Sequence, residues 1–194
     1  MSETGRRLLE AATAAFAAKG FHGTTTRDIA TGAGVTPGAV YVHHRSKEEL
    51  LFQISRHGHE ATLDLLRSTL ERAPDDPVEQ LRALMFEFAR WEAVHHTTAR
   101  IVNYELQALS PEHLADVMAL RQDLRLLVRD LVERGQAAGV FTVGDAGLAV
   151  VTLISLCIDI ARWFSDDGEW TAEQVAAGVS EAGLRLVGAV PTSR

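Results

Sequence analysis

The stretch TTTRDIATGAGVTPGAVYVHHRSKEEL, residues 24–50, decides the fold because it contains the signals for two short helices and for a third that begins after them. Thr24 or Thr25 supplies a hydroxyl N-cap for the first short helix, whose inner face is formed by the small apolar pair Ile29 and Ala30. Gly34 then supplies a sharp turn, since glycine adopts backbone conformations that a side chain resists. These residues predict a short helix followed directly by a tight turn.

The second short helix follows this turn at once. Thr36 is its predicted N-cap, and Pro37 occupies the first helical position, where its missing N–H has no cost. The helix runs for only about seven residues before Ser46, the predicted cap of the next helix. A helix this short has little apolar surface to bury, so we expect it to be presented to a partner. In helix-turn-helix units that partner is DNA.

In these residues the chain resembles the N-terminal DNA-binding domain of TetR-family transcriptional regulators. Two positions depart from the family pattern. His44 stands where the family commonly has an aromatic residue, usually Phe, and Val42 stands where it often has Tyr. The residues that carry the resemblance are Leu8, Ala12, Ala15, Phe16, Lys19-Gly20-Phe21, Thr24 to Ala30, Ala33 to Tyr41, His43 and Ser46 to Leu50.

The resemblance implies an all-α protein of about nine helices that forms a homodimer and binds double-stranded DNA at a near-palindromic operator. Residues 1–50 would form the helix-turn-helix domain, and residues 51–194 a larger helical domain for effector binding and dimerisation. A small-molecule effector would move the long helix that begins at Lys47. The distance between the two recognition helices of the dimer would then change, and operator binding would weaken.

The net charge of −7 has to be divided along the chain before it bears on DNA binding. Residues 1–50 contain six Lys or Arg against five Asp or Glu, whereas the rest of the chain contains 13 against 21. The acidic charge therefore belongs to the body, and a locally neutral to basic N-terminal region is compatible with DNA. The composition, 46% hydrophobic and 23% charged, is that of an ordinary globular protein.

Cys157 is the single cysteine, which excludes an intramolecular disulfide and suits a reducing cytoplasm. A redox sensor is conceivable, but its neighbours Leu156 and Ile158 favour a small buried apolar residue. The N-terminal residues carry no secretory signal pattern. The apolar run from Ala146 to Ile158 is too short to span a bilayer, so we expect a cytoplasmic protein without membrane association.

Helical spacing recurs through the body, whereas the alternation typical of strands does not persist. Ser46 with Glu49 and Thr171 with Gln174 have the spacing of capping boxes. The clearest break is APDDP, residues 73–77. The body helices are predicted over about residues 47–72, 78–95, 98–109, 112–138, 146–164 and 171–187.

The predicted helix over residues 146–164 is apolar on nearly every side, so most of its surface must be covered. The last helix adds Val175, Val179, Ala182 and Leu186 at helical spacing. With their symmetry mates, these two helices would form the four-helix seam of a homodimer. The alternative is that both helices are internal core of a monomer.

Short polar side chains and cations in the helix-turn-helix region suit phosphate oxygens and base edges. Thr36, Gly38 and Ala39 begin the recognition helix, where small residues allow close approach to the bases or contact with thymine methyls. Thr36 could instead be only a cap, and Tyr41 could only pack against the first helix. The candidate DNA contacts are Thr25, Arg27, Thr36, Gly38, Ala39, Tyr41, His43 and Lys47.

Polar and aromatic residues interrupt the apolar helices of the body, and such residues orient ligands in apolar cavities. Arg100 and Asn103 suit an anionic or amide group, whereas Asp159 and Arg162 could simply pair with each other. A structural role stays open for each candidate. The candidate effector contacts are Trp91, His95, Arg100, Asn103, Tyr104, Asp159, Arg162 and Trp163.

Residues 100–106 and 157–164 are similar to regulators of fatty-acid or steroid catabolism that sense acyl-CoA esters. A molecule with a long apolar part and an anionic or amide head also fits the scarce polar groups of the body. We therefore expect a repressor that a small apolar effector, such as an acyl-CoA ester, releases from its operator. The alternative in the same family is a regulator of a multidrug efflux gene that binds aromatic or cationic compounds.

The sequence offers no support for metal or enzyme chemistry. His57 and His59 are two residues apart and His95 and His96 are adjacent, so neither pair shares a helix face as zinc ligands do. No phosphate-binding glycine loop or nucleophile elbow occurs. We predict no metal, cofactor or catalytic residue. The rival classes are a small all-helical enzyme and a helical interaction module, which a gel shift on the chain's own upstream DNA would separate from a regulator.

Overall fold

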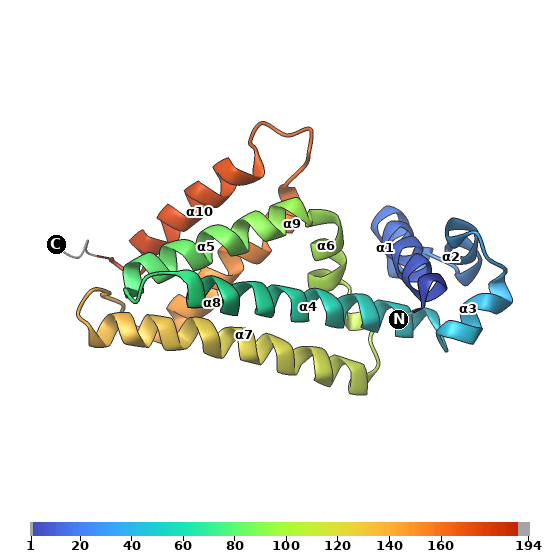
Figure 1. The fold of residues 1–194 in the computed structure, drawn as a ribbon, viewed down its shortest axis with the longest axis horizontal. Coiled ribbons are helices and arrows are strands. Elements are labelled where there is room, and N and C mark those ends of the chain that lie inside the picture. The colour runs from blue at the N-terminus through green and yellow to red at the C-terminus, as the bar shows by residue number, and fades with distance from the viewer. Residues whose placement is uncertain (1, 190–194) are drawn as a thin grey trace. The chain divides into compact units, whose positions relative to one another are not determined.

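In the computed structural model, which describes residues 2–189, helices joined by short loops make up the fold and no strand occurs in that range (Figure 1). The predicted all-α class is confirmed. Asp159 divides the predicted helix over residues 146–164 into two pieces, which together count as one of the nine expected. The elements are α1 (Glu3–Gly23), α2 (Thr26–Ala33), α3 (Pro37–His43), α4 (Lys47–Arg72), α5 (Pro77–Val94), α6 (His96–Tyr104), the 3-10 helix η1 (Leu106–Ala108), α7 (Pro111–Ala137), α8 (Ala146–Ile158), α9 (Ile160–Trp163) and α10 (Ala172–Leu186).

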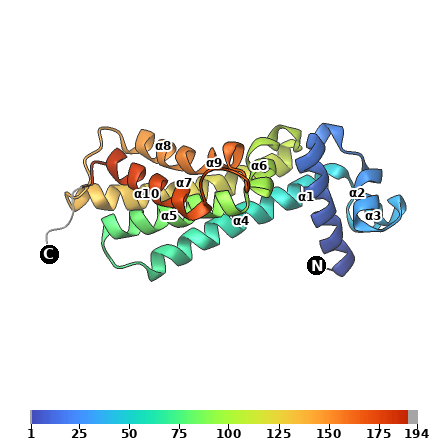
Figure 2. The ribbon, with the colours of Figure 1, turned by 90° about the horizontal axis from the view of Figure 1, so that it is seen from above.

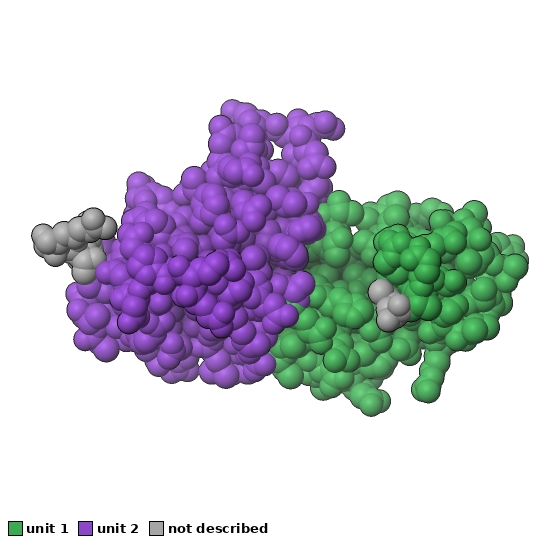
Figure 3. All heavy atoms as spheres, viewed as in Figure 1, with its two compact units in different colours: residues 1–60, 97–120 green, residues 61–96, 121–194 purple. Residues whose placement is uncertain are grey.

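The chain forms two compact units, which Figure 3 distinguishes by colour. The first unit comprises Met1–Glu60 and Thr97–Leu120, and the second comprises Ala61–His96 and Arg121–Arg194. Residues of α4 and α7 therefore occur in both units. This division follows contacts in space, whereas the division into residues 1–50 and 51–194 follows role and stays a prediction.

In the first unit, α1, α2 and α3 lie side by side in both ribbon views (Figures 1 and 2). Their core includes Leu8, Phe16, Ile29 and Val40, all almost completely buried. The same core continues into α4 and into the α6–α7 segment through Leu50, Ile101, Val102, Leu109 and Val117. Helices α1 to α3 are thus supported by residues much later in the chain, as far as Val117, because burial of a shared apolar surface stabilises the packing.

The second unit has α5 and α10 packed along each other, with α8 against both (Figure 2). Leu81, Met85 and Phe88 of α5 are buried there with Leu153 of α8 and Leu184 of α10. Ser180 is buried within this packing and donates a hydrogen bond of 2.9 Å to the carbonyl oxygen of Arg82. The capping box predicted at the start of the last helix, Thr171 with Gln174, is present.

Candidate nucleic-acid interface and effector site

The first helix of the helix-turn-helix unit, α2, begins at a complete capping box. Thr25 Oγ1 accepts a hydrogen bond of 3.1 Å from the Asp28 N–H, and the Asp28 carboxylate accepts one of 2.8 Å from the Thr25 N–H. The Thr25 hydroxyl donates to the same carboxylate, which also pairs with Lys19 at 3.0 Å. The hydrogen bonds from Thr25, and then Lys19, hold the pKa of Asp28 well below its usual range. The N-cap is therefore Thr25, whereas Thr24 ends α1.

The turn between α2 and α3 is the predicted glycine turn. Gly34 has a φ of 66° and a ψ of 36°, the left-handed conformation in which a glycine avoids the strain of a side chain. Its N–H closes α2 by donating to the carbonyl oxygens of Ala30 and Thr31. The Arg7 guanidinium of α1 donates to the neighbouring carbonyl oxygen of Ala33. The angle between α2 and α3 is thus fixed by a local conformation and by α1.

The recognition helix α3 is fixed at its start and on one face. Thr36 accepts a hydrogen bond of 3.3 Å from the Ala39 N–H, and Pro37 occupies the first turn, as predicted. Val40 is completely buried and anchors the inner face. Helix α3 has no other buried residue, and only Ala39 of the rest is partly buried, so most of its surface is available to a partner.

The predicted DNA contacts are mostly exposed. Tyr41 is 58% exposed, so much of its side chain is accessible to a partner. Ala39 and Lys47 are partly buried. The candidates that lie exposed at the start of α2 and on or beside α3 are Thr25, Arg27, Thr36, Gly38, Tyr41 and His43.

Lys47 has a structural role that its sequence position did not indicate. Its ammonium donates hydrogen bonds of 2.7 and 2.8 Å to the carbonyl oxygens of Phe21 and Thr24, at the end of α1. It also lies 4.2 Å from the centroid of the Phe21 ring, within the range of a cation–π contact. An ammonium has three N–H donors, so one remains for the predicted phosphate contact, which stays a prediction.

Phe21, whose carbonyl oxygen accepts from Lys47, is also bound through its N–H. Glu105, which directly follows α6, accepts a hydrogen bond of 3.3 Å from the Phe21 N–H. Gly20, just before it, has a φ of 69° and interrupts the helical backbone of α1. The N–H beyond this interruption therefore finds its acceptor in a residue 84 positions later in the chain.

A second carboxylate connects the beginning of α4 to the beginning of α7. Glu48 accepts a hydrogen bond of 2.8 Å from the Ser110 N–H, and its oxygens lie 2.9 and 3.0 Å from His113 Nδ1. The His113 ring stacks on Phe52 with centroids 3.8 Å apart and planes inclined by 3°. The short segment from Glu105 to His113 thus has two polar attachments to the helix-turn-helix region, and neither is visible in the local sequence pattern.

His44, which replaces the aromatic residue common in the family, ends α3 as its C-cap. Its ring is partly buried, and Nε2 is buried without a hydrogen-bond partner. Burial lowers the pKa of His44, an effect that the Glu49 charge and the Gly5 backbone partly oppose. Burial therefore favours the neutral form of the ring, in which it can fill the place of an aromatic side chain.

Three of the predicted effector contacts lie on α6 in the first unit. Arg100 is exposed, Asn103 is partly buried, and Tyr104 is 43% exposed. The same helix approaches α4 closely, because Val102 leaves no room for a side chain at Gly58, where a Cβ would lie 2.6 Å from it. Helix α6 is therefore firmly packed, and its polar residues precede Glu105 directly in sequence.

The other five predicted effector contacts lie in the second unit. Trp91 lies on α5, and His95 is the C-cap of that helix; their ring centroids are 4.0 Å apart. Burial, and then the charge of Arg90, lowers the pKa of His95. The Arg162 guanidinium and the Asp159 carboxylate lie 3.4 Å apart, so the predicted pairing is present. Trp163 is 49% exposed. That these residues and those of α6 share one effector pocket stays a prediction.

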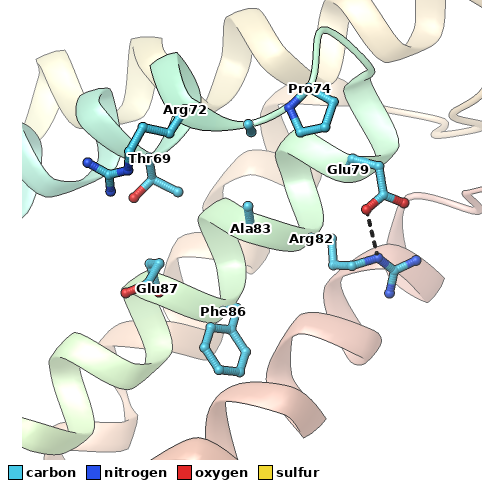
Figure 4. Close-up of a pocket in the computed structure, with 9 residues that line it drawn as sticks. Thr69, Arg72, Pro74, Glu79, Arg82, Ala83, Phe86 and Glu87 are labelled. Carbon is cyan, nitrogen blue, oxygen red and sulfur yellow. Dashed lines mark ion pairs between the residues drawn. The ribbon is translucent and has the colours of Figure 1, made fainter.

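A cavity of about 420 Å³ lies between the end of α4 and the first turns of α5 (Figure 4). Its walls include Thr69, Arg72, Pro74 and Phe86, and the pair Glu79–Arg82 lies at its edge with 3.6 Å between charged atoms. None of the eight predicted effector contacts lines this cavity.

Cys157 is completely buried, and burial raises the pKa of its thiol, with the Glu92 charge acting in the same direction. Its thiolate form is therefore disfavoured. This agrees with the prediction of a small buried apolar residue, whereas a redox sensor needs an accessible thiolate. No group of three metal-ligating side chains occurs in residues 2–189.

Helices α2 and α3 are both capped, are joined by a glycine turn and leave the second helix exposed, and a helical body follows them. This arrangement defines a helix-turn-helix transcriptional regulator. Two family models match the chain: bacterial regulatory proteins of the tetR family over residues 8–54, and the tetracyclin repressor-like C-terminal domain over residues 74–187. The chain belongs to the TetR family, and it is a transcriptional regulator rather than an enzyme.

Known relatives resemble the chain over most of its length. It is 32% identical over 175 residues to the HTH-type transcriptional repressor KstR2 of Mycobacterium tuberculosis, covering 87% of this chain and 84% of KstR2. A tetR-family regulatory protein from Rhodococcus RHA1 superposes with a TM-score of 0.92 at 36% identity, covering 98% of this chain and all of that one. AibR, in complex with isovaleryl coenzyme A and operator DNA, superposes with a TM-score of 0.86 at 25% identity, covering 97% of this chain and all of AibR.

Proposed function

We propose that this protein is a cytoplasmic homodimeric repressor that binds a near-palindromic operator and leaves it when an acyl-CoA ester binds. The observation that carries DNA binding is the construction of α3. Its buried anchor Val40 and its cap Thr36 hold the helix, while Gly38, Tyr41 and His43 face outward. Small and polar side chains on a rigid exposed helix are suited to phosphates and base edges.

The dimer proposal rests on uncovered apolar surface on α8. Leu148 is 67% exposed and Val151 is 47% exposed, and both lie on the same side as Ser155. Residues 146–163 are apolar and long enough to be considered for a membrane span, although only a third of them are buried. The helical run is interrupted at Asp159, and α8 alone rises about 20 Å, short of a bilayer core of about 30 Å. A second copy of the chain explains this surface better.

Helix α10 supplies the other half of the proposed seam. Ala177, Gly178 and Ala182 are exposed, and a Cβ added at Gly178 would meet no atom within 4 Å. Small exposed residues at this spacing let a partner helix approach closely. Of the residues first expected in the seam, Val175 is buried inside its own chain. The surface offered to a partner therefore follows Ala177 to Ala182.

The effector proposal is supported by one solved relative and by the chemistry of α6. AibR was crystallised with isovaleryl coenzyme A, and the acyl-CoA class was expected from the scarce polar residues of the body. Arg100 and Asn103 provide a cation and an amide on the helix that ends next to Glu105. We propose that effector contact on α6 changes the position of Glu105 and so acts on the end of α1.

The experiment is fluorescence anisotropy with a labelled duplex from the upstream region of the chain's own gene, in excess non-specific DNA. We expect saturable binding, and release by an acyl-CoA ester but not by free CoA at the same concentration, because the apolar part must supply much of the affinity. Failure to bind any such duplex contradicts the DNA-binding function. Release by aromatic or cationic compounds, with every ester inactive, supports an efflux regulator instead.

A further inference from the structure

Val42 presents an apolar side chain to solvent at the far end of the recognition helix. It is 80% exposed, more than any other large apolar side chain in residues 2–189, whereas Val40, two positions earlier, is completely buried. The residue is β-branched and lies in a seven-residue helix, where valine is less favourable than alanine. Packing within the chain therefore does not explain its presence.

The helical repeat places Val42 on the outermost line of α3. With about 3.6 residues per turn, positions 38 and 42 lie on the side of the helix opposite the anchor Val40. Position 38 is glycine, and a Cβ there would meet only Thr36 Oγ1, at 4.0 Å. The outer line of α3 therefore has no side chain in its first turn and a compact apolar one in its last. The exposed polar residues Tyr41 and His43 flank it.

This surface has the chemistry of a thymine reader. In the major groove a thymine differs from the other bases by its C5-methyl group. An apolar side chain recognises this group by direct contact. An isopropyl group offers no hydrogen bond, so it cannot select guanine, cytosine or adenine by their donors and acceptors. The absence of a side chain at Gly38 lets the helix backbone approach the bases, which brings Val42 within reach.

We infer that Val42 is an operator-specificity residue that contacts the C5-methyl of one thymine in each half-site. This inference rests on the proposed DNA-binding function and adds to it the base that this position reads. The contact buries apolar groups on both sides. Its loss is expected to reduce affinity about fourfold for each half-site.

The test begins with operator duplexes that the purified full-length protein selects from a random library. Each thymine of the selected duplex is then replaced by deoxyuridine, which removes only the methyl group, and binding is measured for wild type and Val42→Ala. Val94→Ala is the matched control, because Val94 is also exposed, at 49%, but lies on α5.

We expect one position per half-site at which deoxyuridine weakens wild-type and Val94→Ala binding about fourfold. At that position Val42→Ala, whose side chain ends at Cβ, should lose most of this discrimination between thymine and deoxyuridine. The inference is overturned if no position responds in the wild type, or if the same penalty persists in Val42→Ala. A library that yields no enriched sequence contradicts DNA recognition itself, and this inference with it. Folding is not at risk, because alanine favours the helix more than valine does.

Discussion

The Lys47 ammonium donates a hydrogen bond of 2.7 Å to the carbonyl oxygen of Phe21, which lies 26 residues earlier at the end of α1. Carbonyl groups at the end of a helix lack helical partners and carry partial negative charge, so a cation stabilises them. Glu105 accepts from the N–H of the same residue. Phe21 is thus bound from one side by the start of α4 and from the other by the residue after α6.

Replacing Lys47 by Met should destabilise the protein by about 1.5–3 kcal/mol, because two carbonyl groups lose a charged donor. Urea unfolding followed by circular dichroism measures this change. Lys19→Met is the control, since an exposed ion pair contributes less than about 1 kcal/mol. Equal stability of the two variants would contradict the structural role. If Lys47 also contacts a phosphate, Lys47→Met should reduce the salt dependence of operator binding by about one contact.

Replacing Glu105 by Ala should expose the Phe21 amide to exchange. Loss of one hydrogen bond of about 1 kcal/mol corresponds to roughly fivefold faster hydrogen exchange at this N–H. Glu105→Gln keeps an acceptor oxygen and should exchange more slowly than the alanine variant. Gln107→Ala, two residues further on and exposed, is the control. Unchanged exchange in Glu105→Ala would show that the contact does not protect the amide.

Gly38→Ala should separate stability from DNA binding. Alanine in a helix is more stable than glycine by about 0.5–1 kcal/mol, and the added Cβ meets open space in the free protein. The same Cβ would stand between α3 and the bases, so operator affinity should fall while the melting temperature rises. Gly34→Ala provides the contrast, because its left-handed backbone should make that variant about 1–2 kcal/mol less stable. An affinity equal to wild type in Gly38→Ala would remove the outer line of α3 from the interface.

Val151→Asp should convert the dimer to monomers, because an unpaired charge in a buried seam costs several kcal/mol, about 3–5. Sedimentation equilibrium should then give the chain mass of 21.1 kDa rather than about twice that value. Operator affinity should also fall, because a monomer can contact only one half-site at a time. Leu126→Asp on α7, at a residue that is 50% exposed, is the matched control and should stay dimeric. A dimeric Val151→Asp protein would place the seam elsewhere.

His44→Phe should make stability less dependent on pH. Burial lowers the pKa of His44 in the folded state, so the unfolded chain binds its proton more tightly. Its contribution to stability is therefore fully present above the ordinary histidine pKa of about 6.5 and is lost as pH falls below it. Melting curves from pH 7.5 to 5 should decline more steeply for wild type than for His44→Phe. His57→Phe, at an exposed site on α4, should behave as wild type.

The local sequence determined where most helices begin and the turn that makes this a helix-turn-helix protein, although the helix predicted over about residues 98–109 ends at Tyr104 and the one over 146–164 is interrupted at Asp159. The cap at Thr36, the turn at Gly34 and the capping box at Thr171 were all predicted and are all present. The physical reason is that each signal acts on backbone groups no more than a few residues away. The order of these signals was sufficient to identify the family, because helix capping and turn formation need no distant partner.

The tertiary structure decided what holds the reading helices in place. Lys47 looked like a phosphate ligand at a helix start, and Glu105 had no predicted role, yet both bind Phe21. It also decided that α3 buries Val40 and leaves Val42 exposed, although the two side chains are chemically identical. Such outcomes depend on which distant segments meet as apolar surface is buried, and a pattern within one stretch of chain does not contain that information.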